Sequence, residues 1–456
     1  MTDTAEGAAE QLGTRVVSNS LFILAARTVS RVVSLVVVIA LANSLGDSNY
    51  GRYTTLVAYS GLVAVLADLG FAPLYTREAA RSPRELGDYL GTLIVFRVAL
   101  AAVAAVVFAL ALGLGAGLWS LVVPGCALLI TGAYANLLRN TFYSVGRAEF
   151  DAGAIVAEVL IQGVLIFLGA RRHADVGYFV WAYSASYLFT IVYSLVVIRV
   201  FGLGNVRLGL NMALVRRWLP LALPFAITFF LTNLYFRAGV LILQQFRSFA
   251  EVGWYTFAYK PFEALQFVPL AIQAVVYPLL GVYFVSDPSR LKAAYERFYR
   301  VLILLGWPLT VGTFVLVHPI NQLFNRSGAF AQSEDALRIL AFGLYGFLGA
   351  STATVVTEAA LCTFGWWFVQ RHRADLRLPV FGLVWRTLVA GLVMGVILYP
   401  LSRFSIFLAA PAGFAAYALA IYLLRAVSPE EWRLATAIVR RRNPARVPAV
   451  GGGGKA

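Results

Sequence analysis

The chain has 456 residues, of which 60% are hydrophobic and 13% are charged, and its formal net charge is +15. This composition excludes a water-soluble globular protein, and repeated apolar runs of about 20 residues predict helices that span a membrane. In a soluble protein so basic a charge would indicate a nucleic-acid partner. In a membrane protein it indicates arginine-rich cytoplasmic loops beside anionic lipid, so the sequence predicts an all-α polytopic membrane protein with no nucleic-acid partner.

The first apolar run, residues 18–42, carries two arginines near its middle. In a helix, Arg27 and Arg31 share one face with Ser20 and Ser34, while the opposite face is aliphatic. A charge at the bilayer centre costs roughly 2.5 to 3.5 kcal/mol on insertion scales, so both arginines are expected to face protein or a water-filled cavity. The alternative is that they snorkel to the cytoplasmic headgroups, although Arg27 lies roughly 14 Å inside the membrane edge.

Further apolar spans follow along the whole chain. Lysine and arginine gather in the loops that are cytoplasmic when the N-terminus is inside, which predicts both termini on the cytoplasmic side. The stretch 338–369 is longer than one span needs, but two spans there would turn the basic segments after it outward. About twelve spans are therefore expected, at residues 19–42, 54–74, 90–112, 118–138, 152–170, 178–199, 218–243, 253–281, 301–322, 338–369, 381–401 and 404–425.

The longest polar break inside the membrane region, residues 199–217, follows the sixth span and is interpreted as a linker between two lobes. Residues 286–300 carry apolar side chains at helical spacing and are expected to lie along the inner interface as an amphipathic helix. The expected domains are an N-terminal six-helix lobe (1–205), a C-terminal lobe (206–370), two additional helices (371–425) and a basic cytoplasmic tail (426–456).

Polar side chains inside the spans form a predominantly cationic set. In the seventh span Asn233, Arg237 and Gln244 share one face, and in the eighth Lys260 begins a polar stripe. An excess of positive charge in a cavity between the lobes suits an anionic cargo. The candidate cavity residues are Arg27, Arg31, Arg97, Arg237, Lys260 and Gln266.

The carboxylates inside the spans allow a second interpretation, in which they neutralise the cations and only hold helices together. Lys260 and Glu263, at positions i and i+3, are an expected pair of this kind. Carboxylates in such positions are also candidates for exchanging a proton or cation during a transport cycle. The candidate coupling-ion residues are Asp68, Glu158 and Glu358.

Cysteine and histidine usage predicts neither a disulfide nor a metal site, and no cofactor is expected. Cys126 and Cys362 both lie inside apolar runs, and the three histidines are scattered. The acidic, alanine-rich start of the chain lacks the basic region of a signal peptide, so the first span is expected to remain in the mature protein.

Three blocks of the sequence carry a family resemblance. Residues 41–81 (LANSLGDSNYGRYTTLVAYSGLVAVLADLGFAPLYTREAAR) resemble the first loop and second span of the polysaccharide-exporting lipid-linked oligosaccharide flippases, part of the multidrug/oligosaccharidyl-lipid/polysaccharide exporter superfamily. Residues 251–312 resemble the eighth and ninth spans of that family, and residues 349–359 (GASTATVVTEA) resemble the start of its twelfth. The similarity covers most of the chain and contains no catalytic signature.

The resemblance implies two six-helix lobes around a central cavity, with two further helices at the C-terminal end. It implies a non-enzymatic protein of the cell membrane that moves a polyprenyl-diphosphate-linked saccharide from the inner to the outer leaflet, for cell-surface polysaccharide or glycoprotein synthesis. The implied partners are this lipid-linked saccharide, membrane lipid and other membrane proteins of polysaccharide assembly. In related flippases cavity arginines hold the diphosphate, a role that falls here on Arg27, Arg31 and Arg237.

The sequence departs from the family in two places. Family members often have an aspartate soon after the basic residue of the seventh span, where this chain reads RAGVL from Arg237. The family usually has fourteen spans, and a span pair is missing here near residue 349, which leaves open a degenerate, non-transporting relative. A drug/cation antiporter of the same superfamily would need unpaired cavity carboxylates, and a membrane glycosyl-transfer enzyme would need a large aqueous loop, so both are weaker alternatives.

Overall fold

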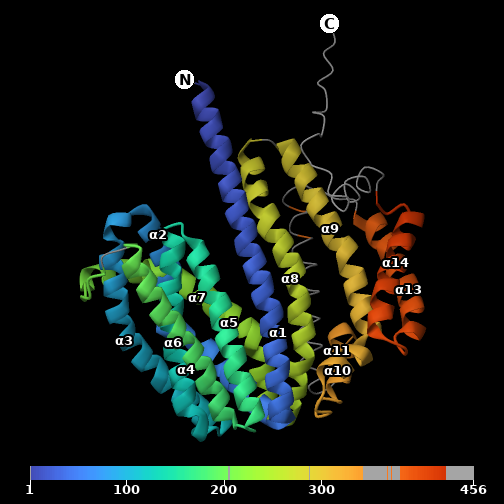
Figure 1. Cartoon of the computed structure of the whole chain (residues 1–456), viewed down its shortest axis with the longest axis horizontal. Coiled ribbons are helices and arrows are strands. Elements are labelled where there is room, and N and C mark those ends of the chain that lie inside the picture. The colour runs from blue at the N-terminus through green and yellow to red at the C-terminus, as the bar shows by residue number, and fades with distance from the viewer. Residues whose placement is uncertain are drawn as a thin grey trace. The chain divides into compact units, whose positions relative to one another are not determined.

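Every described element of the chain is a helix, which confirms the predicted all-α class (Figure 1). The computed structural model describes residues 2–203, 206–286, 288–342, 367, 371 and 380–427. The contacts of the chain group into two compact units, Met1–Ala271 with Asn321–Cys362, and Ile272–Ile320 with Thr363–Ala456. The lobe boundary expected at residue 205 remains a prediction.

The first unit begins with α1 (Thr2–Asp68), which joins two helices at a kink. The break is a single residue, Gly46, with φ 74° and ψ 178°, a backbone conformation that glycine adopts without steric cost. The prediction of a loop between the first two spans is therefore wrong, because the chain is helical on both sides of Gly46. The second span also ends earlier than residue 74, since Leu69 and Gly70 have positive φ values and α2 (Phe71–Arg81) starts after them.

The next four spans lie close to their predicted positions. Asp175 caps the N-terminus of the fourth of these helices, α6, by accepting a hydrogen bond from the Tyr178 amide at 3.2 Å. Short helical turns connect these helices: the 3-10 turns η1 (Pro83–Glu85) and η3 (Trp119–Leu121), and the π-helical turn η2 (Ala111–Gly115). The four helices are α3 (Leu86–Leu110), α4 (Val122–Ser144), α5 (Ala148–Arg171) and α6 (Val176–Val200).

Two longer helices follow, α7 (Met212–Phe246) and α8 (Phe249–Ser286). Asn211 caps the start of α7 by accepting from the Leu214 amide at 3.0 Å, and Pro220 and Pro224 lie inside this helix. The described packing places α7 against both α1 and α2. This contact brings the polar face of the seventh span onto the first helix.

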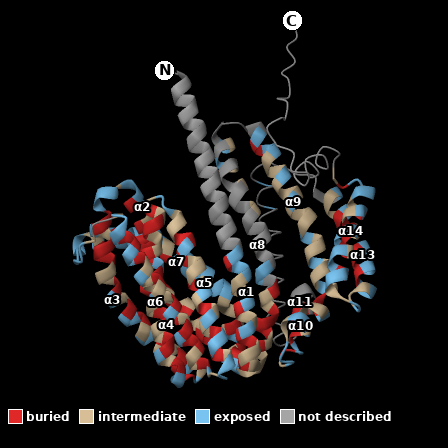
Figure 2. Cartoon of the chain, viewed as in Figure 1, coloured by how far each residue is buried: buried red, intermediate tan, exposed pale blue. Residues whose placement is uncertain are grey.

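Large apolar side chains fill two regions of the first unit, where Figure 2 colours the helices red as buried. One region surrounds Leu41, Phe108 and Phe179, which are at most 1% exposed. The other surrounds Phe71 and Phe142. Close packing of these side chains fixes α1 to α6 relative to one another.

The second unit contains α9 (Pro288–Val315), α13 (Val380–Leu401) and α14 (Ile406–Leu423), packed around Met394, Leu398 and Tyr417. The interfacial helix expected at 286–300 is not a separate element, because its residues from 288 onward form the first half of α9. The expected ninth span is divided at residue 316, where α10 (Val317–Phe324) begins. Of the expected span 338–369, α11 (Ser333–Phe342) covers the start, and most of the remainder lies outside the described residues.

Nine helices among the described residues are long and apolar enough to cross a membrane. Their outward surfaces are apolar: Val164, Phe167 and Leu188 are between 54% and 60% exposed. Several polar side chains are buried instead, including Arg97 at 2% exposure. An apolar exterior around a partly polar interior is what a lipid environment requires, and the chain is a multi-pass membrane protein.

Candidate functional site

The structure leaves three of the sequence-predicted site residues without a described side chain. Arg27 lies in α1 and Gln266 lies in α8; for both residues the structure describes the helical backbone but not the side chain. Glu358 falls outside the described residues. Arg31, one turn after Arg27, has an exposed side chain on α1 and forms no ion pair within the described part of the chain.

Arg97 of α3, whose side chain is buried, forms an ion pair with the partly buried Asp68 at the end of α1. The guanidinium of Arg97 also donates to the carbonyl oxygen of Ala133 in α4. The second carboxylate oxygen of Asp68 accepts from the amide of Ala72 at 3.3 Å, at the start of α2. Both charges are therefore paired, and their contacts join α1, α2, α3 and α4. The interpretation of these residues as ion pairs that hold helices together predicts such an arrangement.

Lys260 forms the pair expected from its spacing with Glu263. The ammonium nitrogen lies 2.7 Å from Glu263 Oε2, one helical turn further along α8. Both side chains are partly exposed, so this contact contributes little to stability. The positive charge of Lys260 is nevertheless already paired with a carboxylate.

Arg237 differs from these cations, because within the described residues it has no ion-pair partner. It lies half-buried on α7 with its side chain against Gly61 of α1. A Cβ at Gly61 would lie 3.5 Å from Arg237 Nε and 3.7 Å from Asn233 Oδ1, so the glycine leaves room for both side chains. The predicted face of Asn233 and Arg237 is therefore directed at α1.

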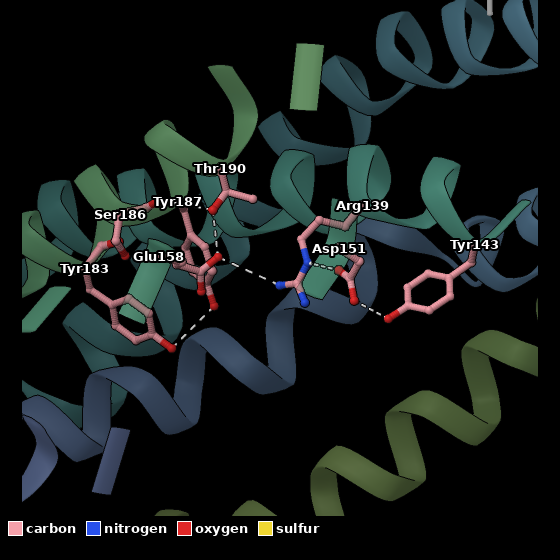
Figure 3. Close-up of polar contacts among 8 residues, drawn as sticks. All are labelled: Arg139, Tyr143, Asp151, Glu158, Tyr183, Ser186, Tyr187 and Thr190. Atoms are coloured by element: carbon pink, nitrogen blue, oxygen red, sulfur yellow. Dashed lines mark hydrogen bonds and ion pairs between the residues drawn. The ribbon is translucent and has the colours of Figure 1, made fainter. Parts of the chain in front are cut away.

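A buried carboxylate cluster lies between α4, α5 and α6 (Figure 3). Arg139 Nε lies 2.7 Å from Asp151 Oδ1, and its Nη1 lies 3.8 Å from Glu158 Oε2. Thr190 Oγ1 donates to the same Glu158 oxygen at 2.7 Å. Tyr143 donates to Asp151. One guanidinium thus serves two carboxylates, and Glu158 is the more distant of them.

Of this cluster the sequence predicted only Glu158. The fourth span was expected to end at residue 138, which would place Arg139 in the following loop; this was wrong, because α4 continues to Ser144 and Arg139 lies within the helix, paired with Asp151. The signal that could have revealed the cluster is the spacing of Asp151 and Glu158, which are two helical turns apart on one face.

Two tyrosines of α6, Tyr183 and Tyr187, lie beside Glu158 (Figure 3). Tyr187 Oη donates to Tyr183 Oη at 3.3 Å, and their rings stack with centroids 5.0 Å apart.

No group of three or more histidine, cysteine or acidic side chains within the described ranges is placed to hold a metal ion. The polar groups described in this region instead suit binding of an anion by Arg237 and exchange of a proton by a carboxylate. Neither task needs a covalent step.

A model of one protein family, described as polysaccharide biosynthesis protein, matches residues 16–284. The fold is similar to a solved structure of lipid II flippase MurJ in an inward closed conformation, with a TM-score of 0.55 and 12% identity over 93% of each chain. It is also similar to an inward-facing multidrug resistance MATE family transporter of the MOP superfamily, with a TM-score of 0.51 and 13% identity over 90% of this chain and 96% of the other. No curated protein sequence matches the chain significantly.

Proposed function

Because the chain belongs to the polysaccharide biosynthesis protein family, we propose that it is a flippase for a polyprenyl-diphosphate-linked oligosaccharide. It moves this lipid from the inner to the outer leaflet of the plasma membrane, with both of its own termini in the cytoplasm. The transferred saccharide then serves synthesis of cell-surface polysaccharide or glycoprotein. The observation that carries the proposal is Arg237, a cation directed at α1 that is left without an ion pair among the described residues.

The charge of the diphosphate sets the energetic problem of transport. One unit charge near the bilayer centre costs roughly 2.5 to 3.5 kcal/mol on insertion scales. An opposite charge at about 4 Å returns about 4 kcal/mol at an effective dielectric constant of 20. One arginine therefore offsets about one negative charge, and a dianionic head group requires a second cation.

We assign the first contact to Arg237 and the second to Arg31, which is exposed on α1. The remaining predicted cavity residues contribute in different ways: Arg27, Lys260 and Gln266 as further polar contacts, and Arg97 by positioning helices through its pair with Asp68. In this proposal the polyprenyl tail stays in lipid while the two lobes alternate in access. One of the carboxylates Asp68, Glu158 and Glu358 exchanges the coupling ion.

The likeness to a multidrug transporter raises the alternative of a cationic cargo. Such a cargo would require carboxylates that are free to face it. Asp68 and Glu263 are instead paired with Arg97 and Lys260, and Glu158 shares Arg139 with Asp151. The pattern of pairing within the described residues favours an anionic cargo.

The test is transfer of a lipid-linked diphosphate oligosaccharide across liposomes that contain the purified protein. We expect transfer above empty liposomes, and a loss of at least about tenfold in Arg237→Ala, since removing one charge contact of about 1.4 kcal/mol already has that effect. Arg172→Ala is the matched control, because Arg172 is exposed in a turn and has no ion pair in the described structure.

Two results would count against the proposal. Wild-type protein that transfers no diphosphate-linked lipid but transports a cationic dye would support the antiporter instead. Equal transfer by wild type and Arg237→Ala would remove Arg237 from the cargo site. Thermal unfolding of each variant in detergent separates loss of function from loss of fold.

A further inference from the structure

The loop that follows α10 inserts one aromatic side chain between α1 and α8. Residues 325–331 are mostly exposed, but Phe330 within them is 0% exposed. Its ring stacks on Phe257 of α8 with centroids 4.2 Å apart, and meets the ring of Tyr50 of α1 edge-on at 5.7 Å. We call Tyr50 and Phe257 the seat of Phe330. In the orientation predicted from the sequence, this junction lies on the outer side of the membrane.

The seat contains a buried hydroxyl group that is not satisfied. Tyr50 is 0% exposed, and its Oη has no hydrogen-bond partner among the described residues. Four buried side-chain polar atoms of the described structure lack a partner, and three of them, in Ser44, Tyr50 and Thr55, lie within twelve residues of α1. Buried polar groups are normally bonded, and a hydroxyl group that has given up water without a new partner costs free energy. The seated state of Phe330 therefore carries a cost that the entry of water would remove.

The loop is held in shape by its own hydrogen bonds. Asn325 Oδ1 accepts from the Phe330 amide at 3.2 Å. The Phe330 carbonyl oxygen accepts from Ser333 Oγ at 2.6 Å and from Asn321 Nδ2 at 3.3 Å. All these bonds lie within residues 321–333, so the backbone around the buried ring needs no partner from α1 or α8.

The donors on α1 and α8 that hold the loop each have a second partner in place. Asn43 Nδ2 donates to the Phe324 carbonyl at 2.6 Å and to a carbonyl of its own helix at 2.8 Å. Trp254 Nε1 donates to the Ala329 carbonyl at 3.2 Å and to Asp47 Oδ2 at 3.0 Å. Both side chains keep a bond when the loop moves away, so its departure leaves neither donor without a partner.

We propose that residues 325–331 form a releasable plug, which moves away from α1 and α8 as a preformed unit and withdraws Phe330 from its seat. Burial of the aromatic ring stabilises the seated state, and the unsatisfied hydroxyl group of Tyr50 lowers that stability. Release of the plug does not depend on the nature of the cargo. Its role in transport, which is to let the head group pass on the outer side, rests on the proposed function.

Hydrogen exchange of the full-length protein in lipid nanodiscs tests the release. The Ser327 amide is the reporter, because it donates to Asn43 Oδ1 at 2.9 Å across the contact with α1. Tyr50→Phe removes only the unsatisfied oxygen, so it should favour the seated plug. We expect exchange in residues 325–331 to slow at least about fivefold, the lower end of the effect of a buried hydroxyl group without a partner, and the melting temperature to rise.

Tyr75→Phe is the matched control. Tyr75 is also 0% exposed, but its hydroxyl group is hydrogen-bonded to Thr141 Oγ1 at 3.0 Å. Its removal should lower the melting temperature and leave exchange in residues 325–331 unchanged. A second variant acts in the opposite direction: Trp254→Phe keeps an aromatic ring, loses the hydrogen bond to the Ala329 carbonyl and should accelerate exchange in the plug.

Two exchange results would overturn the plug. One is exchange in residues 325–331 that is as fast in Tyr50→Phe as in wild type, or faster. The other is equal slowing in Tyr50→Phe and Tyr75→Phe, since this would trace the effect to loss of any buried hydroxyl group.

Transfer across liposomes separates the plug from the flippase proposal. If the plug has to leave before the head group can pass, Tyr50→Phe should transfer a lipid-linked diphosphate oligosaccharide severalfold more slowly than wild type, although the variant is more stable. Transfer at the wild-type rate would overturn the role of the plug in transport. Absence of transfer by wild type would overturn the flippase proposal, while hydrogen exchange still decides whether the plug is released.

Discussion

Gly51 of α1 and Phe249 of α8 lie in direct backbone contact: a Cβ at Gly51 would be only 1.7 Å from the Phe249 carbonyl oxygen. The contact is reciprocal, since a Cβ at Gly253 of α8 would lie 2.1 Å from the Asp47 carbonyl oxygen. Two glycines thus allow the helices to meet without side chains between them. Trp254 reinforces this junction through a 3.0 Å hydrogen bond from Nε1 to Asp47 Oδ2.

Replacing Gly51 by alanine is expected to separate α1 from α8. The added methyl group meets backbone, which cannot move aside like a flexible side chain, so the free energy of unfolding should fall by at least about 1 to 3 kcal/mol. Thermal unfolding in detergent measures the change. Gly209→Ala is the control, because nothing lies within 4 Å of a Cβ there and its melting temperature should stay unchanged.

Removing the positive charge of Arg97 is expected to be more costly than removing Asp68 and Arg97 together. Arg97→Gln leaves the partly buried Asp68 carboxylate without its partner, and loss of one partner of a buried pair costs up to about 3 to 5 kcal/mol. The double variant Asp68→Asn, Arg97→Gln should recover part of that loss. Unfolding curves of the two single variants and the double variant form a cycle, and simple additivity would contradict the expectation.

A comparison pair measures the effect of burial on this result. Arg81 and Glu78 form an exposed pair at 3.5 Å on α2. Arg81→Gln should change the free energy of unfolding by no more than about 1 kcal/mol, because solvent screens exposed pairs. A loss as large as that of Arg97→Gln would indicate a general effect of charge.

Asn43 is expected to hold the segment after α10 in place. Its Nδ2 donates to the Phe324 carbonyl at 2.6 Å, and its Oδ1 accepts from the Ser327 amide at 2.9 Å. Asn43→Ala removes both bonds, so hydrogen exchange of residues 325–331 should accelerate. Asn211→Ala, which removes a cap at the start of α7, should accelerate exchange there and leave 325–331 unchanged.

Filling the space at Gly61 is expected to impair anion binding while leaving Arg237 in the chain. Gly61→Ala should be tolerated, since its Cβ would be in ordinary contact with Arg237 Nε at 3.5 Å. Gly61→Val adds two further methyl groups and should displace the guanidinium, weakening farnesyl diphosphate binding severalfold in calorimetry. Gly306→Val, at a helical position with nothing within 4 Å of its Cβ, should bind as the wild type does.

The sequence predicts the membrane helices well where the length of an apolar run alone determines where a helix lies. Helices α3, α5, α6, α13 and α14 lie within a few residues of their expected spans, because a bilayer requires runs of about 20 apolar residues, whereas α4 continues to Ser144, past its expected end at residue 138. The polar run around Gly46 was expected to be a loop, but Asn43 and Asp47 bind residues more than two hundred positions away. These partners satisfy the polar side chains inside helical structure, and no local pattern reveals them.

The candidate site was predictable in its residue types and less so in its pairings. The unpaired cation Arg237 and its neighbour Asn233 were found by helical spacing, and so was the pair of Lys260 with Glu263. Arg139 was missed because it lies just past an apolar run, where helix and loop look alike in sequence. Arg139 is paired with Asp151 of the following helix. This is a tertiary contact, and the positions of apolar spans in the sequence do not predict it.

The pair of Asp68 and Arg97 also constrains how the molecule moves. Its contacts join the end of α1, the middle of α3 and the carbonyl of Ala133 in α4 at one point, where the Arg97 side chain is buried. Pulling any one of these helices away would expose a charge to an apolar interior. During a conformational cycle these helices, with the start of α2 that also binds Asp68, must therefore move together, and bending is expected at joints outside them, such as the glycine break in α1.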